Sequence, residues 1–109
     1  MPRDAGLPPG TLVLLILRVL NSAPLHGYAI AQRIHAVSRE QLSVEEGSLY
    51  PALQRLLLNG WVKASWTTSE SGRRVREYRL TTSGRKHLDT AEAEYRRVNQ
   101  AIGWLLDHA

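Results

Sequence analysis

Residues 47–60, GSLYPALQRLLLNG, restrict the fold of this chain more than any other stretch. On a helical wheel their apolar side chains gather on one side, and their small or hydrogen-bonding side chains gather on the other. The apolar side holds Leu49, Ala52, Leu53, Leu56 and Leu57, and the opposite side holds Ser48, Pro51, Gln54 and Arg55. Gly60 is expected to end the helix, because an alternating strand pattern starts at Trp61. The stretch therefore predicts a helix that packs by one side and offers the other to a partner.

A β-hairpin is predicted directly after this helix. Residues 61–67 and 75–80 alternate between apolar and polar side chains around a polar loop, in which Gly72 supplies the turn. The inner face is expected to hold Val62, Ala64, Trp66, Tyr78 and Leu80, and the outer face Lys63, Ser65 and Arg79. We expect Trp61 and Trp66 to belong to the core at the base of the hairpin.

Basic residues are concentrated in this hairpin. The whole chain has a net charge of +4, but residues 63–86 alone hold seven basic and two acidic residues, a net charge of +5. A positive field on one hairpin favours a polyanionic partner, although a solvated charged strand face has the same composition. A two-sided helix followed by a basic hairpin is typical of a DNA-reading helix and its wing.

Two helices are predicted before this pair of elements. Residues 10–21 are almost entirely apolar, with Arg18 as their only charge. A helix of this kind should be buried on most sides, and in so small a domain one face is expected to meet a second subunit. After a break at residues 22–27, a second helix is predicted from Pro24 to about Val37, and it should bury Leu25, Ile30, Ile34 and Val37.

The start of the third helix has two interpretations. Residues 43–46, SVEE, fit a capping box, which would start the helix near Val44 and leave Pro51 inside it with a local kink. A start at Ser48 would place Pro51 in the first turn instead. We prefer the earlier start, because Gly47 has no side chain to clash with the proline ring. A short strand is expected at residues 41–43.

A long helix is predicted at the end of the chain, capped by Thr81 and running to about Asp107. Its apolar residues recur at intervals of three and four, as in the seam of a coiled coil, although so few heptads also suit a helix that lies on its own core. The seam, together with two residues of the first helix, gives the expected dimer contact: Leu14, Leu17, Leu88, Ala91, Tyr95, Val98, Ile102 and Leu105.

Several classes of protein are excluded by what the sequence lacks. It has no Cys, its four His lack metal-ligand spacing, and no phosphate loop or nucleophile motif is present. We therefore expect neither metal, cofactor nor enzymatic activity. The apolar run at residues 12–17 is too short for a bilayer, and signal-peptide features are missing, which favours a cytoplasmic protein.

Five short motifs occur in a fixed order: LHGY at 25–28, GSLYPAL at 47–53, RL at 55–56 before GWV at 60–62, YRLT at 78–81, and Gly84 with Leu88 four positions later. In this order they closely resemble the PadR-like family of winged-helix transcriptional regulators, over residues 10–105. The resemblance implies a mainly α fold with a small β-hairpin, a winged helix-turn-helix. Its expected parts are a flexible arm at 1–9, a DNA-binding domain at 10–81 and a dimerisation helix at 82–109.

The resemblance also implies a function, that of a homodimeric bacterial repressor on double-stranded DNA. By position, the DNA contacts would be Ser48, Tyr50, Gln54 and Arg55 on the third helix and Gly72, Arg73 and Arg74 at the wing tip. Gln54 suits adenine, Arg55 suits guanine or a phosphate, and Tyr50 suits either a phosphate or the rim of the core. The two tip arginines suit the minor groove, and Lys63 and Arg76 would add phosphate contacts.

Two points leave alternatives open. Family members tend to carry charged residues where this chain has Leu57 and Leu58, which suggests either packing under the wing or a contact with a partner protein. A winged-helix module for protein–protein interaction is therefore the alternative function. Trp104 suits ordinary packing, but it is also a candidate for an effector pocket between subunits, because aromatic faces bind flat ligands.

Overall fold

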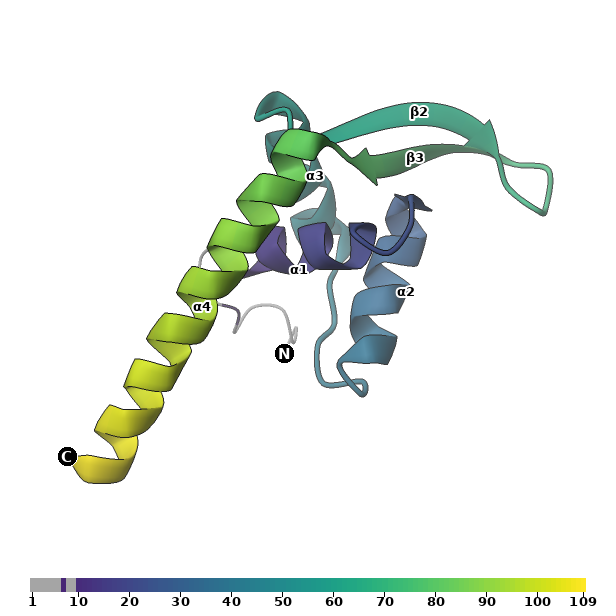
Figure 1. Cartoon of the computed structure of the whole chain (residues 1–109). Helices are drawn as coiled ribbons and strands as arrows, with labels where there is room; N and C mark the ends of the chain where they lie inside the picture. Colours follow the sequence, from purple (N-terminus) through teal and green to yellow (C-terminus); the bar gives the residue numbers. More distant parts are fainter. Residues whose placement is uncertain (1–6, 8–9) are drawn as a thin grey trace.

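The computed structural model describes residue 7 and residues 10–109 (Figure 1). Most of the predicted arm, residues 1–9, lies outside this described part. The elements in chain order are α1 (Thr11–Leu20), β1 (Leu25–His26), α2 (Gly27–Val37), α3 (Glu46–Leu58), β2 (Val62–Thr68), β3 (Arg74–Leu80) and α4 (Thr82–His108). The first three helices pack together, the β2–β3 hairpin projects from one side, and α4 runs away from the other (Figure 1).

The predicted hairpin is present, and a third short strand extends it into an antiparallel sheet with the order β1-β3-β2. Val37 was expected to be buried but is 67% exposed. Residues 25–26 were expected inside the second helix, and that expectation is also wrong. Leu25 pairs with Tyr78 and His26 with Glu77, so α2 begins only at Gly27. His26 has an extended backbone and acts as the N-cap, because its Nδ1 accepts a hydrogen bond from the Ala29 N–H at 3.4 Å.

The capping box expected at residues 43–46 does not form. α3 begins at Glu46, between the two predicted starts, and its N-cap Glu45 makes no side-chain cap hydrogen bond. The strand expected at 41–43 is also absent, since residues 41–45 have no regular structure. The side chain of His35 holds this segment instead, because its Nδ1 lies 3.0 Å from the Leu42 carbonyl oxygen. Pro51 lies inside α3 without ending it, as the sequence indicated.

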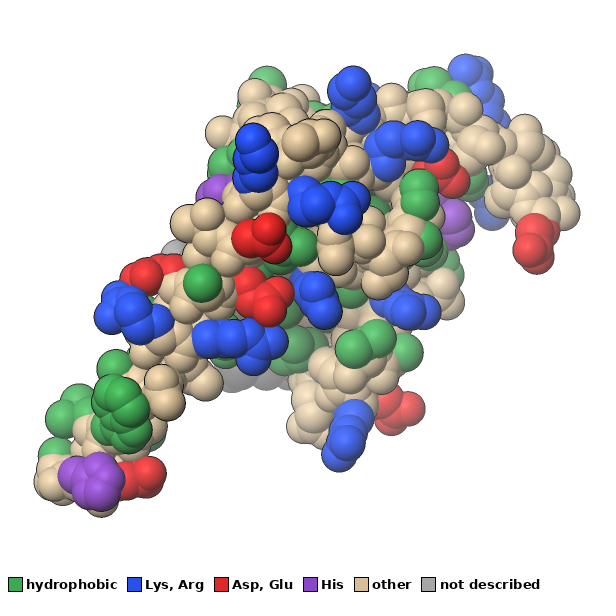
Figure 2. All heavy atoms as spheres, viewed as in Figure 1, with side chains coloured by type: hydrophobic (Ala, Val, Ile, Leu, Met, Phe, Trp, Pro, Cys, Tyr) green, Lys and Arg blue, Asp and Glu red, His purple; other side chains and the backbone are tan. Residues whose placement is uncertain are grey.

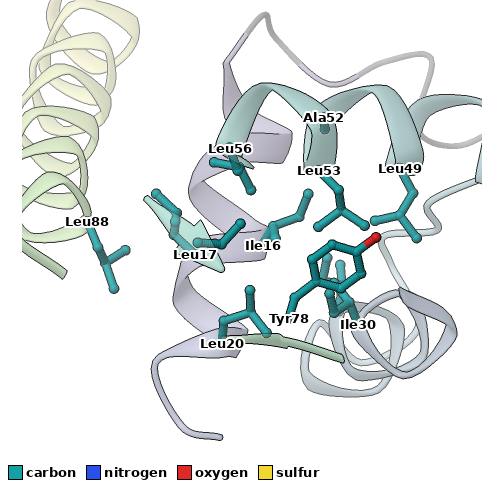
Figure 3. Packing of buried hydrophobic residues seen from close by; sticks show 12 residues of the cluster. Ile16, Leu17, Leu20, Ile30, Leu49, Ala52, Leu53, Leu56, Tyr78 and Leu88 are labelled. Carbon is teal, nitrogen blue, oxygen red and sulfur yellow. The ribbon is translucent and has the colours of Figure 1, made fainter. Parts of the chain in front are cut away.

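The core lies where α1, α2 and α3 meet the base of the sheet (Figure 3). The apolar side of α3 is buried as predicted, with Leu49, Ala52, Leu53 and Leu56 at most 1% exposed. Tyr78 enters the core from β3 and Leu88 from α4 (Figure 3). α1 is largely covered within the single chain, which leaves less of it free for a second subunit than the sequence suggested.

The burial of Leu17 and Leu88 corrects two of the predicted dimer residues. These side chains are 0% and 1% exposed, so they are covered within the single chain. The cause is that the first turns of α4 pack across α1 instead of projecting beyond the domain. The coiled-coil spacing is therefore shared by a part of α4 that belongs to the core and a part that does not.

α4 starts at a close joint with the base of the wing. Thr81 caps the helix as predicted, accepting a hydrogen bond from the Gly84 N–H at 2.9 Å. A Cβ on Gly84 would overlap the Trp61 carbonyl oxygen, so only glycine allows this approach. The half-buried Trp61 ring stacks on His87 with ring centroids 3.6 Å apart. Trp61 thus belongs to the wing base as expected, whereas Trp66 is 59% exposed and the prediction of a core role for it is wrong.

The far half of α4 carries exposed apolar side chains. These are Tyr95, Val98, Ile102, Trp104, Leu105 and Leu106, between 39% and 77% exposed. Hydrophobic side chains gather at this end of the helix, and Lys and Arg side chains lie higher up (Figure 2). Among the described helices, none is both long and apolar enough to cross a membrane.

Candidate nucleic-acid interface

The outer side of α3 is exposed along its whole length. Ser48, Gln54 and Arg55 lie on the surface, opposite the buried leucines, as the helical wheel predicted. The start of this helix is the positive end of the helix dipole, which favours a phosphate oxygen. This side of α3 is therefore free to meet a polar partner.

Tyr50 stands between α3 and the start of α2. Its side chain is 46% exposed, and its hydroxyl lies against Gly27, where an added Cβ would be 2.8 Å from that oxygen. Gly27 itself is buried. The Tyr50 ring thus packs against α2 on one side and is open to solvent on the other. This position is compatible with both roles that the sequence allowed, the rim of the core and a contact with a phosphate.

The inner face of the wing carries a row of aromatic and basic side chains. The strand register pairs Ala64 with Tyr78 and Trp66 with Arg76, so these four share one face of the sheet. The guanidinium of Arg74 lies over the Trp66 ring at 4.7 Å from its centroid, and that of Arg76 lies 5.9 Å from the centroid of Tyr78. Burial raises the pKa of Tyr78 above its ordinary value, although Arg76 opposes the shift. The Tyr78 hydroxyl is therefore neutral at physiological pH.

A cleft of about 550 Å³ separates this face from the starts of α2 and α3. Its walls bring together residues from five elements and the loop between β2 and β3. They are His26, Gly27, Tyr28, Glu46, Tyr50, Trp66, Ser69, Ser71, Arg73, Arg74, Val75, Arg76 and Tyr78. Three arginines and one acidic residue line it, so the cleft favours an anion.

The tip of the wing is a tight turn. Gly72 has a φ of 83°, a left-handed conformation that glycine adopts without strain. The N–H groups of Gly72 and Arg73 donate to the Ser69 carbonyl and hydroxyl oxygens at 2.9 and 3.2 Å. The turn fixes the backbone while the side chains of Arg73 and Arg74 remain exposed.

Lys63 lies on the opposite face of the hairpin. It pairs with Arg79 in the strand register, on the outer side that the sequence predicted, and Arg79 contacts Glu77 at 3.7 Å. Lys63 is therefore not brought together with Arg74 and Arg76.

Sequence reasoning included only four residues of the cleft, Tyr50, Arg73, Arg74 and Arg76, and it missed the other nine. Of these nine, Tyr28 is 63% exposed beside the cleft, His26 lines its wall, and Trp66 stands on the wing. The LHGY motif contained a signal for the first two, because it places both at the start of a helix. Trp66 was assigned to the correct face of the sheet, but it was expected to be buried in the core.

The remaining candidate residues lie on α4 and α1. A shallow groove of about 180 Å³ between these helices is lined by Leu14, Leu15, Arg18, Glu92, Tyr95 and Arg96. Ala91 is half-buried, while Trp104 is 59% exposed and is not part of this groove. The described residues contain no group of three or more His, Cys, Asp or Glu that could hold a metal ion.

An exposed polar helix face and a basic hairpin, joined across a cleft, define a winged-helix DNA-binding domain. The model of the transcriptional regulator PadR-like family matches residues 16–90. The chain belongs to this family, and it is therefore a transcriptional regulator that binds DNA. The family consists of regulators, not of enzymes.

Similar proteins support this assignment. An uncharacterized 37.1 kDa protein in a transposon of Streptomyces fradiae is 42% identical over 89 residues, which cover 82% of this chain and 24% of that protein. The structure of a transcriptional regulator from Clostridium thermocellum has a TM-score of 0.78 and 29% identity, covering 86% of this chain and 91% of that one. A PadR family regulator from Eggerthella lenta has a TM-score of 0.76 and 30% identity, with 92% and 85% covered.

Proposed function

We propose that this regulator is a homodimeric, cytoplasmic repressor that binds a pseudo-palindromic operator and associates with the nucleoid through DNA. The observation that carries the proposal is a cleft between the start of α3, at Glu46 and Tyr50, and the basic inner face of the wing, next to the exposed side of the same helix. A duplex that offers its major groove to α3 brings a phosphate backbone alongside the cleft. The shape and the positive charge of the site then both favour double-stranded DNA.

Within this arrangement the side chains contact different parts of the DNA. Gln54 and Arg55 read base edges in the major groove, where they pair bidentately with adenine and guanine. Ser48 lets the backbone approach a phosphate, and the Tyr50 hydroxyl donates to another. Arg73 and Arg74, on the turn at Gly72, and Arg76 supply the salt-dependent affinity of the wing. Lys63 is left out of the proposed contact, because it lies on the other face of the hairpin.

The proposed dimer forms through the far half of α4. Tyr95, Val98, Ile102 and Leu105 continue the coiled-coil spacing and are all exposed in the single chain, and Leu106 adds further apolar surface. A continuous apolar strip of this kind marks an interaction site on a protein in water. Ala91 and Leu14 lie nearer the core and form the edge of the contact. Two-fold symmetry would place the two α3 helices about 34 Å apart, in successive major grooves.

Selection of bound genomic fragments tests the operator. Fragments of the source genome enriched by the protein should share one motif repeated with two-fold symmetry, and its half-sites should lie about one helical turn apart. Sedimentation of the free protein should give the mass of a dimer. Enrichment without any shared motif would contradict a sequence-specific operator, and a monomer at micromolar concentration would contradict the dimer.

Leu58 favours a second candidate function. Its side chain is 78% exposed at the end of α3, whereas Leu57 packs against the core, so packing under the wing accounts for Leu57 only. An exposed leucine beside the DNA-facing side suits a contact with a partner protein. Binding of a short mixed-sequence duplex at low salt separates the two functions, because a protein-interaction module should bind such DNA weakly or not at all.

Response to an effector is the third element of the proposal. Trp104 is exposed on α4, where a dimer partner would enclose it beside a flat ligand. Ligand screening by tryptophan fluorescence, with Trp104→Ala as the control, tests this role. A ligand that releases DNA equally well from the variant would exclude Trp104.

A further inference from the structure

Trp66 is an exposed tryptophan that the core does not explain. It lies on the inner face of β2, 59% exposed, two positions along the face from the half-buried Ala64. A large apolar ring in this position remains in contact with water in the free protein. The Trp66 ring makes a cation–π contact with Arg74, whose guanidinium lies over the ring at 4.7 Å from the centroid.

This contact is diagonal across the hairpin. Arg74 pairs with Thr68 in the strand register, and Trp66 is the next residue of β2 on the same face. Diagonal neighbours are within reach of aromatic and long side chains, and a guanidinium over an exposed tryptophan is stabilised by about 0.5–1 kcal/mol. The ring therefore restricts the rotamers of an arginine that would otherwise move freely at the end of a strand.

Arg73 provides the contrast within the same turn. It is exposed like Arg74, and the turn fixes its backbone through hydrogen bonds with Ser69. Over the part of the chain that the structure describes, however, only Arg74 and Arg76 lie over aromatic rings. Adjacent arginines thus differ in how far their guanidinium groups are held in place before any ligand arrives.

We propose that Trp66 is a positioning residue for DNA binding. It holds the guanidinium of Arg74 over the cleft, where that group meets a phosphate of the DNA strand that runs between the wing and α3. The wing then binds chiefly through its inner face at Arg74, and the tip residue Arg73 contributes less. This inference rests on the proposed function, because it requires that the duplex backbone occupies the cleft.

The physical reason is preorganisation. An arginine that is already held loses less side-chain entropy on binding, and immobilising a long side chain costs about 0.5–1.5 kcal/mol. Trp66, Arg73 and Arg74 all line the cleft, so Arg74 differs from Arg73 in its contact with the ring and not in its access to the site. Trp66 has a second way to act, by stacking directly on a sugar or base, and an experiment can distinguish the two.

A double-mutant cycle on the full chain gives the test. The probe is a short mixed-sequence duplex, and its affinity is measured over a series of salt concentrations. Trp66→Ala should weaken binding about two- to fivefold. It should also lower the salt slope by up to about 0.9, the change expected when one phosphate contact is lost, although no charge has been removed. In the Arg74→Ala background, Trp66→Ala should have almost no further effect on either quantity.

Matched variants control for the ring and for the neighbouring arginine. Trp66→Phe keeps an aromatic face and should retain most of the affinity, whereas Trp66→Leu keeps apolar bulk without that face and should behave like Trp66→Ala. Arg73→Ala should combine additively with Trp66→Ala, because it is the guanidinium of Arg74 that lies over the Trp66 ring. Thermal unfolding of every variant should stay within about 0.5–1 kcal/mol of the parent protein, the stability of the cation–π contact itself, since Trp66 is exposed.

Three results would overturn the inference. An equal loss in the parent and Arg74→Ala backgrounds would mean that Trp66 touches DNA by itself. An unchanged salt slope in Trp66→Ala would mean that Arg74 contacts phosphate without the ring. A DNA affinity of Trp66→Leu equal to that of the parent protein would exclude a role for the cation–π contact. Failure of the parent protein to bind any duplex at low salt would instead contradict the proposed function, so the two failures are distinguishable.

Discussion

The two halves of α4 carry the same apolar spacing but have different surroundings. In the first half, Gly84 and Leu88 are buried against the wing base and the core. In the second half, Ile102 and Leu105 are 49% and 64% exposed. The comparison teaches that one continuous helix both completes a subunit and leaves an apolar strip uncovered. The first half should determine stability of the single chain, and the second half should determine association.

The largest expected effect is at Leu88. Leu88→Ala removes a side chain that is 1% exposed and leaves a cavity between α4 and the core, so we expect a loss of about 2–5 kcal/mol in the free energy of unfolding. The matched control is Leu106→Ala on the same helix, where the side chain is 77% exposed. Urea denaturation at low protein concentration should show little change for the control. Equal losses in both variants would contradict the division of α4 into two halves.

Gly84 sharpens the comparison by testing backbone contact. Gly84→Ala places a Cβ on the Trp61 carbonyl oxygen, which cannot move aside as a side chain can, so α4 must shift from the wing base. We expect a loss of about 1–3 kcal/mol in thermal or urea unfolding.

Gly103 is the control for this substitution in the exposed half of α4. No atom lies within 4 Å of a Cβ at that position, so Gly103→Ala should stabilise the helix of the single chain by up to about 1 kcal/mol. A Gly84→Ala variant as stable as the parent protein would show that the joint between α4 and the wing base is loose.

Association is the third comparison. Ile102→Glu puts a charge on the apolar strip, where a second subunit would have to desolvate it, so the dimer should dissociate at least tenfold more readily, about 1.4 kcal/mol. Because Ile102 is half exposed in the single chain, thermal unfolding of the subunit should change little. Sedimentation over a concentration series measures the first quantity. The control is Asn99→Glu, an exposed polar position on the same stretch of helix. If both variants weaken the dimer equally, the apolar strip is not the dimer contact.

The sequence predicted the elements whose cause is local. The apolar side of α3, the Thr81 cap and the faces of the hairpin follow from spacing and side-chain type, and the structure confirms them. The strand at Leu25 and His26 was missed, because two residues become a strand only through pairing with β3, which is far along the chain. Periodicity alone gives no sign of such a partner.

The errors in the candidate site have a related cause. Alternation placed Trp66 on the correct face of the hairpin, but it does not report how far the helices extend beneath that face, and they end before Trp66 is covered. Likewise, the spacing of α4 put Leu88 and Leu105 in one strip, although α1 covers only the first of them. Side-chain direction is a local property, whereas burial depends on neighbours from other parts of the chain.

The smallest expected effect concerns a third glycine, at which the neighbour is a side chain instead of a backbone atom. Gly27→Ala would place a Cβ 2.8 Å from the Tyr50 hydroxyl oxygen. The end of the Tyr50 side chain can rotate away, so stability should fall by less than in Gly84→Ala. DNA affinity should fall about two- to fivefold, because the hydrogen bond from the Tyr50 hydroxyl to an anionic phosphate, about 1.5–3 kcal/mol when well aligned, is only partly lost.

Fluorescence anisotropy with a labelled duplex measures this change, and Tyr50→Phe is the matched variant, since it removes the same hydroxyl without moving the ring. In the Tyr50→Phe background, Gly27→Ala should cost little further affinity, because the group that it displaces is already absent. If Gly27→Ala instead weakens binding by the same factor in both backgrounds, the start of α2 contacts DNA independently of Tyr50. The backbone of α2 at Gly27 would then maintain the shape of the cleft, as the backbone of α4 at Gly84 maintains the base of the wing. The two glycines would differ only in their neighbour, a side chain at Gly27 and a backbone carbonyl at Gly84.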